Sequence, residues 1–448
     1  MIIQIAYDMT GIQINLADVT ARPDNVPTVE LTGCRPLSPV RMEHSFTDDS
    51  GTVWRSYANM YADTFGSASN VSTPSHQGTY RDIDPLGFAW SMIPVDAEAA
   101  PTLAERYKRY PSTQPAFRNP YGPIDITMTA YVGDQKVASA IYERHQIAPD
   151  IDIIDVNDDG LRGVYYAPHT PTKKEGIIVM GGSSGGIDRY WARHVASLGY
   201  NVLNLAYFNY PGLPDTCTQI PLEYFKKAID WLKHRTGTDR VGLQGASRGG
   251  EAVLLIASTF PDDIACTVSY VPMHVMTGGF VPGKTDSISA WTLKGADLPY
   301  AYTPVPTAED CRARGIDLSR GLPVVPFFFD LIDEAEKDEN AWIPLEKATA
   351  PILMITARDD AIWACSHGAE RALDRIAKYG GTAKAEHLAF DGAGHILPPT
   401  GAITSLSTSV YHEHAGLLIA LGGTPAVNAH AGDKAWQRVA QFYAENLA

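Results

Sequence analysis

From about residue 150 onward, short apolar runs alternate with stretches in which apolar residues recur at helical spacing. The apolar runs include EGIIVMGG, GYNVLNLAYF, VGLQG, ACTVSYVP and PILMITA, and several are bounded by glycine. Strands that alternate with helices pair in parallel, and the helices then cover both faces of the sheet. This rhythm restricts the fold more than any other feature, and it predicts an α/β domain with a mostly parallel sheet over residues 149–448.

The N-terminal part has the rhythm of β-structure. Residues 124–132, IDITMTAYV, alternate apolar and polar side chains, and the turn GDQK then leads into VASAIYERH, which predicts a hairpin. Further short strands with turn signals precede it, among them TVELTG and PVRMEHSFTD. We therefore expect an immunoglobulin-like β-sandwich domain over residues 1–148. The Pro- and Gly-rich span at about 276–340 interrupts the α/β rhythm and predicts a cap insertion.

The charge balance restricts the class of partner. The chain has 36 basic and 51 acidic residues, which gives a formal net charge of −15. This balance argues against nucleic acid as a partner and against a polybasic membrane-binding surface. An anionic substrate would have to meet a local basic patch, because the overall field of the protein repels it. We expect a small-molecule substrate, and the sequence does not reveal the oligomeric state.

The cysteines and the apolar segments indicate the compartment. The five cysteines are odd in number and scattered, and no CxxC pair occurs, as is typical of a reducing compartment. The N-terminal stretch MIIQIAYDMTG has no basic segment of the kind that begins a signal peptide. No run of 18 apolar residues is present to span a membrane. We therefore expect a soluble, cytoplasmic protein.

The stretch VGLQGASRGGEAVLL, residues 241–255, contains the pattern Gly-x-Ser-x-Gly with Ser247 at its centre. An apolar run precedes the serine and a helical pattern follows it, which is the strand–turn–helix context of a nucleophile elbow. Gly245 and Gly249 allow the tight turn and the close backbone approach that expose the serine hydroxyl. The pattern alone is weak, because a small residue in a glycine-rich turn gives the same letters.

Two downstream residues could activate this serine. A serine hydroxyl needs a base, and the base needs an orienting acid; in α/β-hydrolases they follow in the order Ser, Asp or Glu, His. Asp359 and Asp360 come directly after the strand ILMITA, and His395 lies in a glycine-rich loop after the strand AEHLAF. Because ligands bind at the carboxyl ends of such strands, we predict the triad Ser247, Asp360 and His395, with Asp359 as a solvated turn residue.

An oxyanion hole requires backbone N–H groups that point at the developing negative charge. The N–H of Arg248, directly after the nucleophile, is the first predicted donor. The glycine-rich loop after the strand IIVM supplies the second, for which Ser183 is favoured over Gly182. We expect the Arg248 side chain to lie on the surface, with contact to a coenzyme phosphate as the alternative.

No cofactor and no metal ion are expected. The glycines of GGSSGG fit neither the GxxxxGK[ST] nor the GxGxxG pattern of nucleotide-binding loops. His412 and His414 form a His-x-His pair, but no pattern nearby supplies a third metal ligand.

The segments GGSSGG, GASRGGEAVL, IPLEKATAPILMITARDDAIW and GAGH, with GTYRDIDPLGFAWSM in the N-terminal part, resemble the acyl-CoA thioesterase and bile acid-CoA:amino acid N-acyltransferase family. The resemblance covers most of the chain, although it is not close over 276–340. It implies a β-sandwich joined to an α/β-hydrolase domain that acts on acyl thioesters of coenzyme A. It also implies Ser247, Asp360 and His395 as nucleophile, acid and base, and Trp363 matches a tryptophan found just after the acid.

The expected function is serine-dependent hydrolysis of acyl-CoA or related thioesters through an acyl-serine intermediate. Three alternatives remain open: transfer of the acyl group to an amino acid, hydrolysis of oxygen esters, and a binding protein with a decayed hydrolase. Serine at position 247 favours hydrolysis over transfer, because a serine ester reacts less readily with amines than a cysteine thioester does. The complete triad argues against a decayed enzyme.

Overall fold

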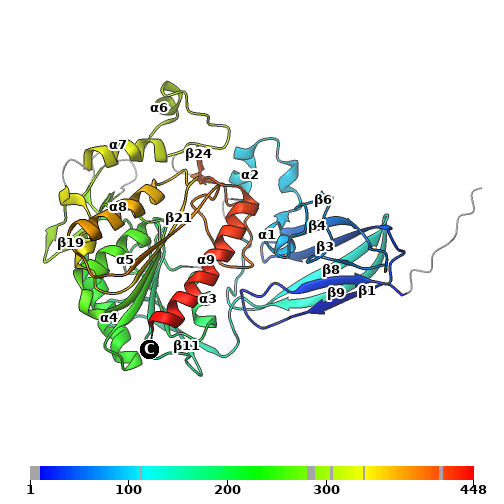
Figure 1. Ribbon diagram of the computed structural model, residues 1–448, viewed down its shortest axis with the longest axis horizontal. Coiled ribbons are helices and arrows are strands. Elements are labelled where there is room, and N and C mark those ends of the chain that lie inside the picture. The colour runs from blue at the N-terminus through cyan, green and yellow to red at the C-terminus, as the bar shows by residue number, and fades with distance from the viewer. Residues whose placement is uncertain are drawn as a thin grey trace, which may run out of the picture.

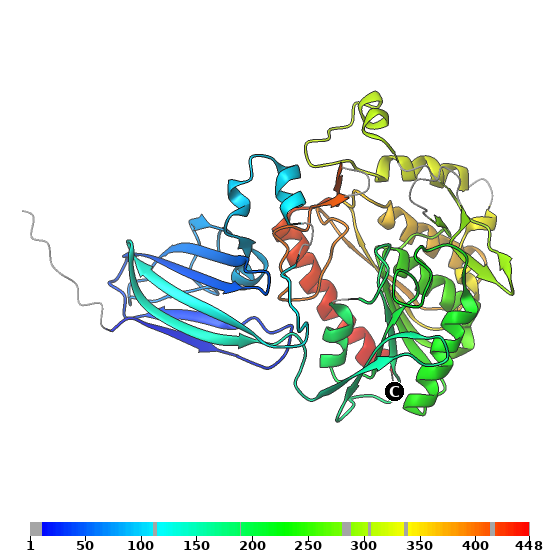
Figure 2. The same ribbon diagram turned by 180° about the vertical axis from the view of Figure 1, so that it is seen from behind.

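A computed structural model describes residues 11–110, 114–188, 190–279, 288–302, 306–335, 339–412 and 417–447. Figure 1 shows a β-rich N-terminal part beside a larger part in which helices cover a central sheet, and Figure 2 shows the same arrangement from behind. The C-terminal helix α9 (Pro425–Asn446) runs along the side of the larger part that faces the N-terminal strands.

The N-terminal part contains two antiparallel sheets. The smaller sheet has the order β1-β2-β5, with β1 (Gln13–Ala17), β2 (Thr28–Thr32) and β5 (Ala68–Ser69). The larger sheet has the order β6-β4-β3-β8-β9, with β7 also paired to β4; its strands are β3 (Pro39–Thr47), β4 (Val53–Tyr61), β6 (Gln77–Gly78), β7 (Ile93–Pro94), β8 (Ile124–Val132) and β9 (Gln135–Arg144). The helices α1 (Gly87–Trp90) and α2 (Leu103–Arg109) follow β6 and β7.

The predicted hairpin is confirmed, since β8 and β9 pair antiparallel along their lengths. Ile126 and Met128, on the predicted apolar face of β8, are buried. Leu31 of β2 and Met42 of β3 belong with Met128 to one core cluster, so the two sheets face each other across a shared core.

The larger part is built on an eight-stranded sheet of order β10-β11-β13-β12-β15-β16-β21-β22. Its strands are β10 (Ile151–Val156), β11 (Arg162–Pro168), β12 (Ile177–Met180), β13 (Val202–Ala206), β15 (Val241–Ala246), β16 (Ile264–Tyr270), β21 (Ile352–Ala357) and β22 (Ala385–Phe390). The pairs from β13 to β22 are parallel, whereas β10–β11 and β11–β13 are antiparallel. The sheet is therefore mixed.

Helices cover both faces of this sheet. Alternate residues of β12 contribute to different cores, with Ile177 in one and Ile178 in the other. The first core takes in α3 (Trp191–Ser197) and α9, and the second takes in α4 (Leu222–Thr236), α5 (Arg248–Thr259) and α8 (Cys365–Lys378). Strands β12, β15, β16 and β21 are buried along their whole length, which explains their continuous apolar sequences.

One predicted helix begins later than expected. The pattern predicts a helix over 185–198, but α3 begins at Trp191. Gly185 and Gly186 have φ angles of 65° and 69°, in the left-handed region that does not continue a right-handed helix. The Asp188 carboxylate accepts a hydrogen bond from the Ala192 N–H at 2.9 Å, so this side chain serves the first turn of α3.

The helices of the segment between β16 and β21 lie above the central sheet in Figure 1. This segment contains β17 (Gly278–Gly279), β18 (Ile288–Ser289), β19 (Trp291–Leu293), β20 (Ala296–Asp297), α6 (Ala308–Ala313) and α7 (Val325–Ala335), and β19 pairs with β14 (Ile220–Pro221). A further hairpin, β23 (Ser409–His412) with β24 (Leu417–Ala420), precedes α9. The predicted insertion over 276–340 falls in this segment, and the predicted domain boundary at 148/149 falls between β9 and β10; both stay predictions.

Candidate active site

Ser247 stands between the end of β15 and the first residue of α5, with φ 56° and ψ −119°. A non-glycine residue rarely adopts such a conformation, which occurs where the surrounding structure imposes it. Two glycines permit the turn. A Cβ atom at Gly245 would lie 2.1 Å from the carbonyl oxygen of Gly249, and one at Gly249 would lie 2.4 Å from that of Gly181. Any larger residue at either position would push the turn apart.

The three predicted triad residues meet at the carboxyl edge of the sheet. The Nε2 atom of His395 lies 3.0 Å from Ser247 Oγ, and its Nδ1 atom lies 2.7 Å from Asp360 Oδ2. The other oxygen of Asp360, Oδ1, accepts hydrogen bonds from the backbone N–H groups of Ile362 and Trp363 at 2.8 and 3.0 Å. These contacts hold both oxygens of the carboxylate and fix the plane of the imidazole that faces the serine.

The neighbouring aspartates have different surroundings. Asp360 is buried, with 5% of its surface exposed, whereas Asp359 is exposed. The backbone N–H of Asp359 donates to the carbonyl of Ala393, which joins the loop after β21 to the loop that carries His395. Of the two aspartates, Asp360 is the one that contacts the imidazole of His395.

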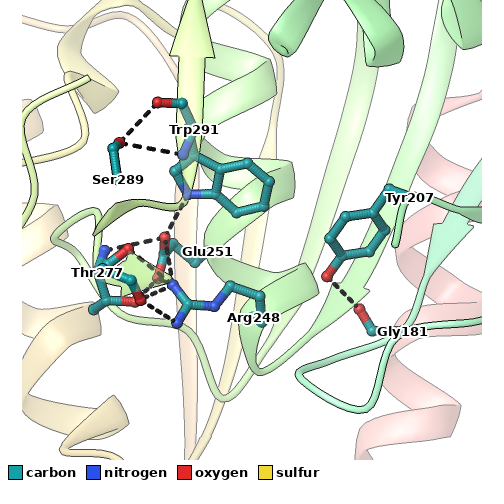
Figure 3. Close-up of polar contacts among 8 residues, drawn as sticks. Gly181, Tyr207, Arg248, Glu251, Thr277, Ser289 and Trp291 are labelled. Carbon is teal, nitrogen blue, oxygen red and sulfur yellow. Dashed lines mark hydrogen bonds and ion pairs between the residues drawn. The ribbon is translucent and has the colours of Figure 1, made fainter. Parts of the chain in front are cut away.

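The loop after β12 passes beside the serine. A Cβ atom at Gly182 would lie 3.1 Å from Ser247 Cβ and 3.6 Å from its Oγ, so no side chain fits between this loop and the hydroxyl. The Tyr207 hydroxyl donates to the carbonyl of Gly181 at 3.0 Å and anchors the start of the loop (Figure 3). Ser183, the favoured second donor, is exposed one residue further on.

The prediction that the Arg248 side chain lies on the surface is wrong. The residue is buried, with 8% of its surface exposed, and its guanidinium forms an ion pair with Glu251 at 3.1 Å. It also donates to the carbonyl oxygen of Thr277 at 3.1 Å (Figure 3). A further donor of the guanidinium reaches the carbonyl oxygen of Gly278 at 3.0 Å. Because the guanidinium already contacts these groups inside the protein, the structure does not support the alternative in which Arg248 contacts a coenzyme phosphate.

Glu251 was not identified from the sequence. Its carboxylate is fully buried and accepts hydrogen bonds from Trp291 Nε1 at 2.7 Å and from the Thr277 N–H at 3.2 Å (Figure 3). The Arg248 guanidinium also lies 5.7 Å from the ring centroid of Trp363, which follows Asp360 by three residues. The sequence contains one signal for this residue: Glu251 is the only acidic residue in the apolar stretch EAVLLIAS. A carboxylate buried in such a stretch needs a partner of opposite charge.

Among the described residues, no group of three or more His, Cys, Asp or Glu side chains is arranged to hold a metal ion. His414, half of the His-x-His pair, lies outside the described residues. Within the same described ranges, we find no helix with the length and apolarity needed to cross a bilayer.

Comparisons with known proteins show which family the chain resembles. Residues 220–448, just over half of the chain, match the family described as BAAT / acyl-CoA thioester hydrolase C terminal, and residues 24–158 match the acyl-CoA thioester hydrolase/BAAT N-terminal region. Acyl-coenzyme A thioesterase 1 of Mus musculus is 26% identical over 431 residues, covering 95% of this chain and 94% of the relative. The mitochondrial acyl-coenzyme A thioesterase 2 of Mus musculus is 26% identical, with 95% and 87% covered, and acyl-coenzyme A thioesterase 1 of Homo sapiens is 25% identical, with 95% and 94% covered. The chain belongs to the acyl-CoA thioester hydrolase/BAAT family.

Proposed function

We propose that this protein is a serine-dependent hydrolase of acyl-CoA or closely related acyl thioesters. The observation that carries the proposal is the unbroken series of hydrogen bonds from Ser247 through His395 to Asp360. A serine needs such a series to act as a nucleophile near neutral pH. The relatives named as acyl-coenzyme A thioesterases align along almost the whole chain and support the thioester as the substrate class.

In this mechanism, His395 Nε2 accepts the proton of Ser247 as Oγ attacks the thioester carbonyl carbon. Asp360 accepts the hydrogen bond from Nδ1–H and stabilises the imidazolium that forms. The tetrahedral intermediate collapses, the carbon–sulfur bond breaks, and His395 gives its proton to the departing thiolate. His395 then takes a proton from water, whose oxygen attacks the acyl-serine. As the second intermediate collapses, the acyl–oxygen bond breaks, His395 returns the proton to Ser247 Oγ, and the acid is released.

The oxyanion of both intermediates would be held by the backbone N–H of Arg248 and by a second N–H from Ser183 or Gly182. The first four N–H groups of a helix have no partner within the helix, and the N–H of Arg248 is the first of α5. The close approach of Gly182 to the Ser247 hydroxyl supports a donor from this loop.

The proposal also includes the domain architecture and the cellular compartment of the protein. We infer an immunoglobulin-like β-sandwich over 1–148 and an α/β-hydrolase domain over 149–448 with a cap over 276–340. The shared core of the two N-terminal sheets supports the sandwich. The five cysteines are all buried free thiols, which supports a reducing compartment such as the cytoplasm.

The test measures free thiol released from a panel of acyl-CoA esters, beside p-nitrophenyl esters of the same acyl groups. We expect saturable thiol release with free acid as the product, and acyl-CoA preferred over the oxygen ester. Turnover of the oxygen esters alone would overturn the thioesterase assignment in favour of a carboxylesterase.

Transfer to an amine is the second candidate, because the family description also covers BAAT. With abundant glycine or taurine present, we still expect free acid as the main product of the wild-type protein. Ser247→Cys should raise the share of N-acyl product, because a thioester intermediate is more electrophilic toward amines. A wild-type enzyme that makes mostly amide would establish the transferase instead, and mass spectrometry of the products distinguishes the two.

A further inference from the structure

A cavity of about 670 Å³ lies between the N-terminal strands and the α/β part, with lining residues from both. Phe117 and Tyr121 line it from the segment before β8, and Ile187 and Tyr190 line it from the loop after β12. Ligand pockets usually have volumes of about 300–1,000 Å³ and a mainly apolar and aromatic lining. The cavity therefore has the size and the aromatic walls of a small-molecule site.

The charged side chains of the cavity make it basic in an acidic protein. Arg118, Arg144 and Arg193 line it, together with Asp49 and Asp188. Backbone N–H groups already engage both aspartates: Asp49 Oδ2 accepts from the Arg118 N–H at 2.6 Å, and Asp188 Oδ1 accepts from the Ala192 N–H at 2.9 Å. Because the chain has a net charge of −15, this cluster is the local basic patch that an anionic ligand would need.

Arg144 belongs to this cluster and lies near Arg193. Its guanidinium donates to the carbonyl of Gly401, and in the described ranges neither Arg144 nor Arg118 forms an ion pair with a carboxylate. Burial and the neighbouring Arg193 lower the pKa of Arg144 from its ordinary value. A partly buried cation without a carboxylate partner is costly, and a bound anion would compensate it.

Two loops connect the cavity to the candidate active site. Ile187 follows Gly182 by five residues, so their Cα atoms lie within about 18 Å of each other. Ala402 and Ile403, in the segment that follows His395, also line the cavity. In coenzyme A the extended pantetheine arm separates the thiol from the phosphates, so a phosphate site that lies apart from the serine but shares a loop with it suits such a carrier.

We propose that the cavity binds the phosphorylated nucleotide end of the thiol carrier, with Arg118, Arg144 and Arg193 as phosphate ligands and Phe117 and Tyr121 beside the base. The inference rests on the proposed function for the identity of the carrier. The phosphate site itself can be tested without any turnover. Arginine suits the role because its planar donors pair with phosphate oxygens in a bidentate manner.

The first experiment titrates the full chain by calorimetry with adenosine 3′,5′-bisphosphate, adenosine and inorganic diphosphate. We expect the bisphosphate to bind at least tenfold more tightly than adenosine, and Arg144→Met to remove at least tenfold of that affinity. Arg118→Met, at an exposed loop position, provides a second variant if Arg144→Met does not fold. Arg35→Met is the matched control, because this exposed arginine does not line the cavity.

Equal affinity for adenosine and its bisphosphate, or equal losses in Arg144→Met and Arg35→Met, would overturn the phosphate site. Diphosphate that binds as tightly as the bisphosphate would overturn the nucleotide assignment and leave a plain phosphate site.

The second experiment compares acyl-CoA with the same acyl group on pantetheine, which lacks the phosphates. We expect Arg144→Met to lower the ratio of kcat/KM for acyl-CoA to that for acyl-pantetheine by about tenfold, mainly through KM. If Arg144→Met kept the wild-type ratio, the result would contradict the phosphate site and leave the proposed hydrolase activity standing. A wild-type protein that cleaves neither thioester would overturn the proposed function, and the calorimetric titration would still decide the phosphate site.

Discussion

The backbone conformation of Ser247 orients the hydroxyl and at the same time costs stability. Its positive φ angle turns the hydroxyl toward His395, and a non-glycine residue in such a conformation costs about 1–3 kcal/mol. The surrounding turn maintains this conformation because Ser247 N–H donates to the carbonyl of Tyr270 at 2.9 Å and α5 begins directly afterwards. Geometry for catalysis is thus obtained at a local cost in stability.

Removing the hydroxyl should abolish turnover without harming the fold. Ser247→Ala keeps the Cβ atom and the backbone conformation, and we expect kcat to fall by at least ~10³-fold. Ser247→Gly should be equally inactive but at least as stable, because glycine accepts the positive φ angle. Thiol-release assays and thermal melts of both variants provide the check. A Ser247→Ala protein that retains a tenth of the wild-type kcat would refute the nucleophile.

The two adjacent aspartates should respond differently to the same substitution. Asp360→Asn should lower kcat by up to ~10⁴-fold, since the imidazole loses the partner of its Nδ1–H and of its positive charge. Asp359→Asn should cost less than about tenfold, because this side chain is exposed. Turnover at pH 8, with circular dichroism to verify folding, distinguishes them. The opposite ranking would mean that the acid has been assigned one residue too late.

Among the elements, α5 joins the nucleophile to the rest of the site. The Arg248–Glu251 pair lies on its first turn and reaches the segment at Thr277 and Gly278 as well as the indole of Trp291. Neutralising one partner of a buried pair leaves the other charge uncompensated, which costs far more than replacing both by apolar residues. The pair therefore couples the segment after β16 to the elbow.

We expect Glu251→Gln to lower the free energy of unfolding by about 3–5 kcal/mol. The double variant Arg248→Met/Glu251→Met should recover at least half of that loss, because no unpaired charge remains, although Trp291 Nε1 still lacks its acceptor. Urea unfolding of the wild type, Arg248→Met, Glu251→Met and the double variant gives the coupling energy, and Glu251→Gln is measured beside them. Strictly additive losses would show that the two charges do not stabilise each other.

At the scale of the whole molecule, polar contacts connect the N-terminal part to α9. His430 Nε2 lies 3.0 Å from Asp84 Oδ2, and Trp90 Nε1 donates to the same oxygen at 2.7 Å. The hydrogen bond with Asp84 raises the pKa of His430 above its ordinary value of 6.5, while Asp433 raises it and Lys434 lowers it to a smaller extent. For Asp84, burial opposes ionisation, but the contacts with His430 and Trp90 give a net lowering of its pKa.

This contact should make the stability depend on pH. A histidine whose pKa is raised by folding stabilises the protein fully below its unfolded pKa, and the contribution is lost as the pH rises through the folded value. The wild type should therefore exceed His430→Gln in stability more at pH 6 than at pH 8.5. The side chain is 44% exposed, so the difference should stay below about 1 kcal/mol. Chemical denaturation at both pH values tests this, and a gap that widens toward pH 8.5 would contradict the assigned sign.

The sequence by itself determined the parallel strands of the α/β part, from β12 to β22, and the residues that could form the triad. Buried parallel strands need continuous apolar runs, and such runs stand out in any chain. The candidate residues followed because Ser247, Asp360 and His395 each come just after one of these runs, and parallel strands bring their carboxyl ends to one edge. These features depend on residues that are close together in the sequence.

Only the tertiary structure decided which charged side chains are buried and what surrounds them. In the sequence Arg248 resembles a surface residue, but in the structure the carbonyl groups of Thr277 and Gly278 cover its guanidinium. The cavity beside Arg144 forms because Gly401 and the loop before α3 meet the N-terminal strands. The late start of α3 also depends on backbone angles that the apolar pattern does not reveal. The burial of these charged side chains depends on segments that are distant along the chain, so local periodicity carries no information about it.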